Sequence, residues 1–512
     1  MFYSEKIAPR FLFSTVFNII RGLFSFAAGL LIARDLGPEE YGNISFLLGI
    51  FIAIRQLIDL GTSTAFFTFI SQKKQSQLFY LMYFGWQLSQ LMIGLIIIAL
   101  IFPQSWITYI WQGQNSHRIL IAFFASFMLN HVWYTTTSVA ESIRKSIMIQ
   151  FINMVVMIVH FSIVYYLIHI STISVEILFY LIGVEYIIAT VISSHFIRSK
   201  LEFDNGSSKT FNDIIREYIK YCIPLMLFAF VSFGYHFADR WFLQKYSGAI
   251  QQGLYAISSK FAMVSLIATA SIINIYWKEI AEAYEKTDYK KIRVLYKTTT
   301  RGLYFISVFI ACLIIPWSEN IVQIFLGDKY ISATLPLTIM LFYPIHQSLG
   351  QINGSTFMAI GMTKQSVVIG NMFLLISIPI VCLLLAPSTG AIPGFGLGAT
   401  GVALKMVFLQ VVAVNVQSFY LSKKLEFKYD WLYQPVNIII FLSLSFALKE
   451  LIPIVLSWFT YYDNLILIVM LSLFMYSLFT IVYVYLFPGM TGQSKRQIDT
   501  IIQTIYSKYG KK

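Results

Sequence analysis

Long apolar runs constrain the fold of this chain more than any other feature of its sequence. Fourteen stretches of about 20 residues carry few charged side chains, and an apolar stretch of that length crosses a lipid bilayer as a helix. Hydrophobic residues make up 57% of the 512 residues and charged residues only 12%, which excludes a soluble globular protein of this size. The sequence predicts an all-α integral membrane protein whose spans are residues 11–33, 42–67, 78–102, 119–140, 147–169, 176–197, 221–244, 254–277, 302–323, 333–358, 366–386, 397–420, 435–453 and 464–487.

The positive charges between these runs alternate along the chain. Of the 37 Lys and Arg residues, 27 lie in every second connection or at the two ends. Cytoplasmic loops carry such an excess, so we expect a multi-pass protein with an even number of spans and with both termini in the cytoplasm. The net charge of +13 then reflects topology and contact with anionic membrane lipids, and no nucleic-acid partner is expected.

Five cations lie inside the predicted spans. A cation at the bilayer centre costs about 2.5–3.5 kcal/mol on insertion scales, so it normally faces a wet cavity or a partner. We expect these residues to line a cavity that binds an anionic substrate, because Arg in particular offers paired hydrogen bonds to phosphate groups. The candidate substrate-binding residues are Arg21, Arg55, Arg240, Lys260 and Lys405.

Structural alternatives stay open for several of these cations. Arg55 and Asp59 are four residues apart and could neutralise one another on one helix face. Arg240 and Lys260 could extend their long side chains to the membrane surface.

The energy source is expected to be an ion gradient. The phosphate-binding motif Gly-x-x-x-x-Gly-Lys-Ser/Thr does not occur, which argues against direct ATP hydrolysis. Three acids at bilayer depth, Asp59, Glu185 and Asp239, are the candidates for coupling to protons or sodium, and the alternative is that they are hydrogen-bonded structural groups. The three cysteines and seven histidines lack metal-ligand spacing, so neither a metal site nor any other cofactor is expected.

A weak internal echo relates two connections. Residues 34–42 follow the first span and residues 245–253 follow the seventh, and each contains a cation, a glycine three positions later and a second glycine five positions beyond it. Because six spans separate them, the two halves would keep one orientation in the membrane. Parallel halves around a cleft are a common transporter plan.

The same residues resemble the polysaccharide transporter (Wzx-type O-antigen or oligosaccharide flippase) family of the multidrug/oligosaccharidyl-lipid/polysaccharide exporter superfamily. The resemblance rests on residues 36–42, residues 239–243 with 253–257, the turn at residues 361–364, and the fourteen-span layout. It implies two six-helix lobes around a central cavity, here residues 1–218 and 219–430. Two further spans at 431–490 and a cytoplasmic amphipathic tail at 491–512 would follow them.

The resemblance also implies a function, which is transport rather than enzymatic catalysis. The expected substrate is an oligosaccharide linked to polyprenyl (undecaprenyl) pyrophosphate, moved from the inner to the outer leaflet of a bacterial cytoplasmic membrane by ion-coupled alternating access. Surface polysaccharide synthesis would then supply further partners, a polysaccharide polymerase and a chain-length regulator. The alternatives are a lipid II flippase, a cation-coupled multidrug exporter and, from another class, a membrane polysaccharide polymerase. The short outer loops argue against the polymerase and the five cations at depth against the exporter.

Overall fold

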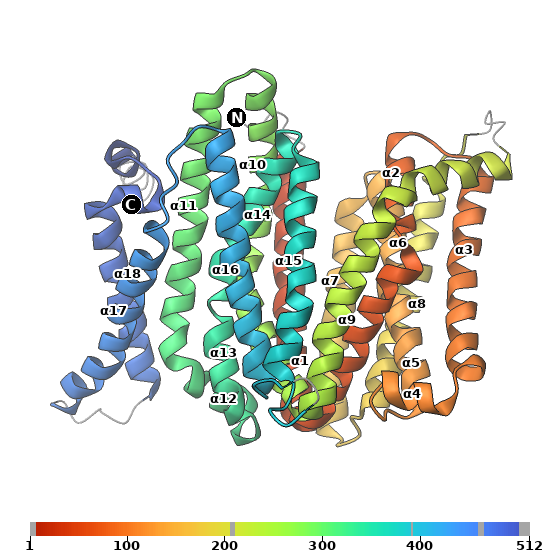
Figure 1. Ribbon diagram of the computed structural model, residues 1–512, viewed down its shortest axis with the longest axis horizontal. Coiled ribbons are helices and arrows are strands. Elements are labelled where there is room, and N and C mark those ends of the chain that lie inside the picture. The colour runs from red at the N-terminus through yellow and green to blue at the C-terminus, as the bar shows by residue number, and fades with distance from the viewer. Residues whose placement is uncertain (1–6, 205–209, 391–392, 459–464, 501–512) are drawn as a thin grey trace. The chain divides into compact units, whose positions relative to one another are not determined.

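The structure is a computed structural model that describes residues 7–204, 210–390, 393–458 and 465–500 (Figure 1). Nearly all of these residues are helical and none of them forms a strand, which confirms the predicted all-α class. The α-helices are α1 (Ile7–Asp59), α2 (Thr62–Gln72), α3 (Gln77–Ile96), α4 (Gln104–Ile110), α5 (Ser116–Phe127), α6 (Trp133–Ser142), α7 (Ser146–His169), α8 (Val175–Arg198), α9 (Phe211–Met263), α10 (Ile267–Glu285), α11 (Tyr289–Ile314), α12 (Ser318–Leu326), α13 (Thr334–Met340), α14 (Tyr343–Ala359), α15 (Thr363–Leu385), α16 (Gly398–Lys424), α17 (Tyr433–Ser457) and α18 (Leu465–Leu486).

Every predicted span overlaps a helix, but the count of fourteen stays a prediction. Among the described residues, eleven helical segments are long and apolar enough to cross a membrane. Two of them, Phe13–Asp59 and Phe211–Leu266, contain 47 and 56 residues, and each has the length of two crossings. By contrast, α14 has only 17 residues and is not one of the eleven.

The chain forms two compact units whose composition does not follow chain order. Unit 1 contains Met1–Ile257, Phe325–Tyr330 and Leu374–Val402, and unit 2 contains Ser258–Ile324, Ile331–Phe373 and Ala403–Lys512. Helices α9, α15 and α16 therefore each contribute to both units. The lobes predicted at 1–218 and 219–430 stay a prediction, as do the later segments at 431–490 and 491–512. Residues 501–512 of the predicted tail lie outside the described residues.

Unit 1 is built around α1, which packs along α7 and against α5. On its second half, Phe46, Leu47, Ile50 and Phe51 recur at helical spacing and are at most 3% exposed. They belong to a core cluster that also contains Phe123 of α5. Lipid tails are as apolar as these side chains, so close packing rather than removal from water favours the contact within a membrane.

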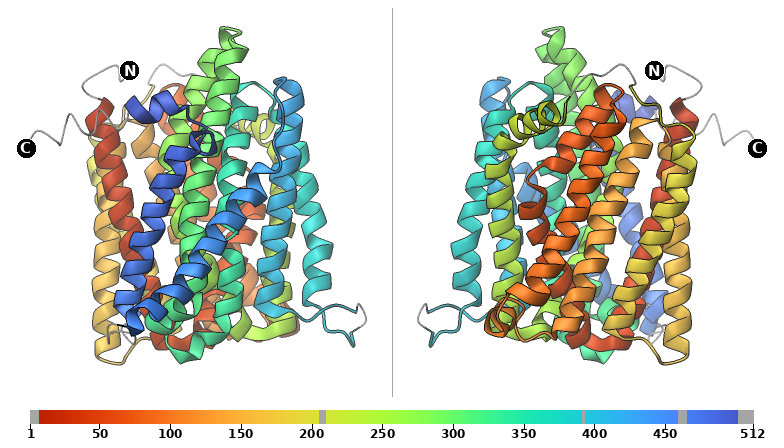
Figure 2. Two further views of the ribbon diagram at one scale, coloured as in Figure 1. Left: turned by 90° about the vertical axis from the view of Figure 1, so that its left-hand side faces the viewer. Right: turned by 90° about the vertical axis from the view of Figure 1, so that its right-hand side faces the viewer.

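Unit 2 has α11 at its centre, packed against α14 and α17. The aromatic side chains of Tyr304, Phe441 and Tyr476 form its core, and the Tyr304 hydroxyl donates a 2.9 Å hydrogen bond to the Gln434 carbonyl. Helices α17 and α18 lie side by side, as the blue helices in the left view of Figure 2 show.

The two long helices α1 and α9 are kinked in the same way. α1 has non-helical backbone at Gly37 (φ 79°, ψ 173°), and α9 has it at Gly248 (φ 81°, ψ 177°). These glycines are the first ones of the two echoing connections, and positive φ values are accessible to glycine without a steric penalty. The structure thus confirms that residues 34–42 and 245–253 are local structural equivalents.

The second glycines of the two connections meet one another at a crossing. A Cβ atom on Gly42 would lie 1.8 Å from the carbonyl oxygen of Ala249, and one on Gly253 would lie 2.0 Å from that of Pro38. Real Cβ atoms do not approach other atoms so closely, so each glycine permits the close approach of the opposite backbone. We call this contact the glycine crossing.

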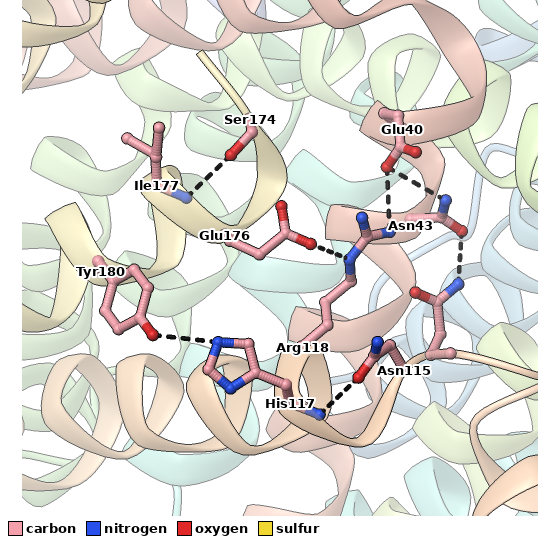
Figure 3. A network of polar contacts seen from close by, with 10 residues as sticks. Glu40, Asn43, Asn115, His117, Arg118, Ser174, Glu176, Ile177 and Tyr180 are labelled. Atoms are coloured by element: carbon pink, nitrogen blue, oxygen red, sulfur yellow. Dashed lines mark hydrogen bonds and ion pairs between the residues drawn. The ribbon is translucent and has the colours of Figure 1, made fainter. Parts of the chain in front are cut away.

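A polar network joins three helix ends of unit 1 (Figure 3). Arg118, in the first turn of α5, donates hydrogen bonds to Glu40 of α1 (3.2 Å) and to Glu176 of α8 (2.7 Å). The amide of Asn43 also donates to Glu40, at 3.4 Å. Arg118 belongs to the few cations on the predicted outer side, and its two ion pairs tie the loops of that side together.

Candidate functional site

The second half of α1 ends in a break that Asp59 holds together. Leu60 and Gly61 have positive φ values, so the chain turns before α2 begins. The Asp59 carboxylate accepts hydrogen bonds from the backbone N–H groups of Gly61 (3.2 Å) and Ser63 (3.0 Å). It also accepts from the hydroxyls of Thr62 and Ser63. Asp59 therefore caps the first turn of α2, where backbone N–H groups otherwise lack partners.

Arg55 lies one turn before this cap and contacts an aromatic ring. Its guanidinium carbon is 5.0 Å from the ring centroid of Tyr134 on α6, which is the distance of a cation–π contact. Within the described part of the chain, no ion pair joins Arg55 to Asp59. The structure therefore does not contain the alternative in which these two residues neutralise one another. Arg55 keeps donors available for an anionic ligand.

Polar groups of α3 and α6 surround the break. Gln90 donates a 2.8 Å hydrogen bond to the Ile58 carbonyl, and the Trp86 indole donates to the Thr62 hydroxyl at 3.4 Å. Gln87 donates to the carbonyl of His131, which belongs to the π-helical segment Met128–Val132. A π-helical turn leaves backbone groups for such contacts and often marks functional sites.

Sequence reasoning missed these α3 and α6 residues as site members. Their signal was present, because Trp86, Gln87 and Gln90 recur at helical spacing on one side of a predicted span. The spacing does not indicate which other helix these side chains contact. Tyr134 in particular is one of 32 tyrosines, and nothing local distinguishes it.

Arg240 of α9 lies against the second half of α1. Its Nη1 atom donates a 3.3 Å hydrogen bond to the Ser45 hydroxyl, and its guanidinium carbon lies 5.4 Å from the Tyr255 ring centroid. Gly49 leaves the room for the side chain, because a Cβ there would lie 2.9 Å from the Arg240 Nε atom. Ser45 and Gly49, one helical turn apart on α1, thus both face Arg240.

Arg21 is exposed on the first half of α1. Exposure leaves its guanidinium accessible to a ligand on that face of α1. The role of Arg21 in substrate binding stays a prediction.

Glu185 has a partner that the sequence did not reveal. Its Oε2 atom is hydrogen-bonded to His160 Nδ1 of α7 at 2.9 Å, and the two residues are 8% and 9% exposed. The second carboxylate oxygen, Oε1, is buried and has no hydrogen-bond partner among the described residues. A buried oxygen without a partner is energetically costly, so it is the natural position for a proton or a water molecule.

The remaining candidates divide between the units. Asp239 is buried in unit 1 beside Arg240 in the sequence. Lys260 and Lys405 belong to unit 2, where Lys260 is half-buried and Lys405 is only 1% exposed. Each unit thus contains candidate cations, and the roles of these three residues stay predictions. No group of three or more possible metal ligands occurs within the described residues.

The geometry of unit 1 supports anion binding by arginine. Arg55 and Arg240 each lie over a tyrosine ring, and within the described residues neither guanidinium forms an ion pair with a carboxylate. Aromatic rings and hydroxyls hold the guanidinium plane while leaving N–H donors for phosphate oxygens.

The chain matches a known protein family in sequence. The family model described as "Polysaccharide biosynthesis protein" matches residues 31–335, which is more than half of the chain. No curated protein matches the chain significantly in sequence.

Solved transporter structures share the fold. Lipid II flippase MurJ in an inward closed conformation is 16% identical, with a TM-score of 0.65 and coverage of 93% of this chain and 99% of that one. An inward-facing multidrug resistance MATE family transporter of the MOP superfamily is 14% identical, with a TM-score of 0.56 over 79% of this chain and 94% of that one. A MOP superfamily transporter from Pyrococcus furiosus is 12% identical, with a TM-score of 0.52 over 81% and 94%. The family match confirms the predicted resemblance to a polysaccharide family, and the structural similarity confirms the predicted all-helical fold.

Proposed function

We propose that this chain, which belongs to the family of polysaccharide biosynthesis proteins, is a flippase for a lipid-linked oligosaccharide. It would move a polyprenyl-pyrophosphate-linked oligosaccharide from the inner to the outer leaflet of a bacterial cytoplasmic membrane, with both termini in the cytoplasm. Its product would serve cell-surface polysaccharide synthesis such as O-antigen, capsule or exopolysaccharide, next to a polymerase and a chain-length regulator.

One observation carries the proposal. A chain of a polysaccharide biosynthesis family has, over 93% of its length, the fold of a protein described as a lipid II flippase. The similarity to the multidrug transporter covers only 79% of the chain. The flippase plan therefore accounts for more of this molecule than the drug-exporter plan does.

The site chemistry fits such a substrate. A pyrophosphate needs positively charged donors at bilayer depth, and Arg21, Arg55 and Arg240 of unit 1 are such donors, with Lys260 and Lys405 of unit 2 as further candidates. Coupling to a proton or sodium gradient replaces ATP hydrolysis, and no cofactor is required. Among the acids, Glu185 fits ion coupling best because it retains a buried oxygen without a partner among the described residues, whereas the Asp59 carboxylate is engaged in the α2 cap.

Reconstitution in liposomes tests the proposal. Purified protein would be given a labelled polyprenyl-pyrophosphate oligosaccharide, and its transfer across the bilayer would be followed with and without an imposed proton or sodium gradient. We expect gradient-dependent transfer. Arg21→Ala should slow it by about tenfold or more, because a hydrogen bond to a charged group is worth about 1.5–3 kcal/mol. Arg21→Lys should retain part of the activity, and Lys286→Ala, in an exposed loop, is the matched control.

The outcomes separate the function from the site. Normal transfer by both Arg21 variants would remove Arg21 from the substrate site and leave the flippase proposal intact. Transport of cationic dyes without glycolipid would replace the flippase by a drug exporter.

A lipid II flippase is the second candidate, and the fold similarity to MurJ favours it. Lipid II carries the same pyrophosphate on the same class of lipid, so the cation sites do not distinguish the two substrates. The same liposome assay with labelled lipid II does. Faster transfer of lipid II than of the oligosaccharide lipid would decide for this alternative.

A further inference from the structure

A basic cavity lies within unit 2, and none of the residues assigned to transport above lines it. Its volume is about 490 Å³, which is within the range of ligand sites in proteins. Four cations line it: Arg293, Lys297 and Arg301 from α11, and Lys428 from the connection between α16 and α17. Asp430 is the one acid among its lining residues. The cavity thus has a large excess of positive charge.

Two of the four cations are held by the protein itself. Arg301 donates to the Asp430 carboxylate at 2.8 Å and to the Gly489 carbonyl at 2.7 Å, and its guanidinium lies 4.6 Å from the Tyr433 ring centroid. Arg293 donates to the carbonyls of Tyr289 and Glu426. These bonds fix both guanidinium groups at the wall of the cavity.

The other two cations, Lys297 and Lys428, lack such contacts within the described residues. Within the described part of the chain, neither Lys297 nor Lys428 forms a hydrogen bond or an ion pair through its side chain. Both are exposed. An ammonium group beside three other cations is repelled by them. An anion that enters the cavity therefore lowers the electrostatic energy of the cluster.

The other walls suit a ligand that is more than a bare ion. Tyr429, Tyr433, Gln434 and Ser418 offer hydroxyl and amide groups, while Phe427 and Leu349 are apolar. Such a mixed surface can hold a phosphate together with the glycerol and ester groups next to it.

The surroundings place the cavity at the level of lipid headgroups. Trp431 and Leu432 directly follow the cavity residue Asp430 and are 61% and 53% exposed. Exposed tryptophan at a helix start is typical of the membrane interface. All four cations also lie in connections that the charge alternation assigns to the cytoplasmic side, where leaflets are rich in anionic lipids.

We propose that this basic cavity binds the phosphate headgroup of an anionic phospholipid of the cytoplasmic leaflet. Arg293 and Arg301 form its preformed wall, and Lys297 and Lys428 close over the phosphate. Basic pockets between membrane helices on the cytoplasmic side bind such headgroups in other proteins. The inference does not depend on which substrate is transported, because it concerns a phospholipid bound at this cavity.

Lipid titration tests the proposal with the full chain purified in a non-ionic detergent. The probes are phosphatidylglycerol, as the anionic lipid, and phosphatidylcholine, as the neutral one. The variant is the double substitution Lys297→Ala/Lys428→Ala, whose side chains support no other contact. The matched control is Lys423→Ala/Lys424→Ala, which removes two exposed lysines at the end of α16 that do not line the cavity.

We expect phosphatidylglycerol to bind more tightly than phosphatidylcholine, and increasing salt to weaken its binding to the unmodified chain. The cavity variant should lose about 25-fold in affinity for phosphatidylglycerol, since each lysine near an anionic lipid contributes about a fivefold factor. The control variant should stay within about twofold of the unmodified chain. The salt dependence needs no variant, so it tests the idea even if a variant misfolds.

Three results would overturn the proposal. An equal loss in the control variant would reduce the effect to general surface charge. Competition by free glycerol phosphate as strong as that by the whole lipid would point to a soluble phosphate ligand. Displacement of phosphatidylglycerol by a lower concentration of polyprenyl pyrophosphate would make the cavity an entry site for the transported lipid.

Discussion

Asp59 illustrates, at the scale of single residues, how a charged group at bilayer depth can serve the fold. Its carboxylate accepts four hydrogen bonds from the first turn of α2, so it has little capacity left for a second task. Glu185 is the opposite case. It shares one hydrogen bond with His160 and keeps a second oxygen without a partner among the described residues.

Replacing Asp59 with alanine should weaken the start of α2. Loss of a helix cap costs about 0.5–2 kcal/mol, so we expect the free energy of unfolding of Asp59→Ala to fall by that amount, measured by thermal or denaturant unfolding in detergent. Asp59→Asn, which keeps one acceptor oxygen, should cost less and should transport with normal gradient dependence. Loss of gradient dependence in Asp59→Asn at unchanged stability would return Asp59 to the ion-coupling residues.

Glu185→Gln should separate coupling from folding. Glutamine keeps an acceptor for His160 but does not take up a proton, so the variant should fold and transfer glycolipid down its own gradient. We expect an imposed pH gradient no longer to accelerate that transfer. Glu185→Ala should in addition lose about 1–3 kcal/mol of unfolding free energy, because His160 stays buried without its partner. An unchanged response of Glu185→Gln to the pH gradient would exclude this carboxyl from coupling.

Sequence reasoning named the charged residues within the apolar runs and missed their partners. Arg55 was placed beside Asp59 by spacing along one helix, yet it contacts Tyr134 on another. His160 and Glu185 are 25 residues apart on α7 and α8, and their contact depends on how both helices are rotated about their axes. A rotation of 100° moves a side chain to its sequence neighbour's position, and packing of the whole unit sets that rotation.

At the scale of helices, the connections were better predicted than the packing. The glycines in residues 34–42 and 245–253 form only a weak repeat, but their positions are informative because glycine is the residue that best permits a positive φ and a close backbone approach. The structure has matching kinks at Gly37 and Gly248 and a reciprocal contact at Gly42 and Gly253. The break at Leu60 and Gly61 was not predicted, because the apolar run 42–67 continues through it.

Gly42→Ala should destabilise unit 1. The added methyl group would lie 1.8 Å from the Ala249 carbonyl oxygen, so α1 and α9 must move apart. Overpacking of this kind costs about 1–3 kcal/mol, which thermal unfolding would detect. Gly85→Ala is the control, because nothing lies within 4 Å of its Cβ position on α3, and it should leave stability equal or slightly higher. Equal stability of both variants would show that the crossing tolerates separation.

At the scale of the molecule, the sidedness of the connections is a prediction that rests on charge alone. The basic connection between α10 and α11 is predicted in the cytoplasm, and the loop around α4 outside it. Single cysteines at Lys286 and Ser105 test this, since both positions are exposed. In a chain without its three native cysteines, we expect an impermeant maleimide to label the Ser105 position in spheroplasts and the Lys286 position only in inverted vesicles. Labelling of both positions from one side would contradict the five spans predicted between them.

The glycine crossing has a consequence for ancestry. If the two connections descend from one duplicated segment, then each copy has since become the other's immediate neighbour. A larger residue at either second glycine collides with the backbone of the other connection. The atom it meets is a carbonyl oxygen, which no side-chain substitution can remove. Amino-acid substitution at the glycine crossing is therefore restricted in both copies at once. The shared spacing of their glycines would persist longer than sequence similarity in the helices around them.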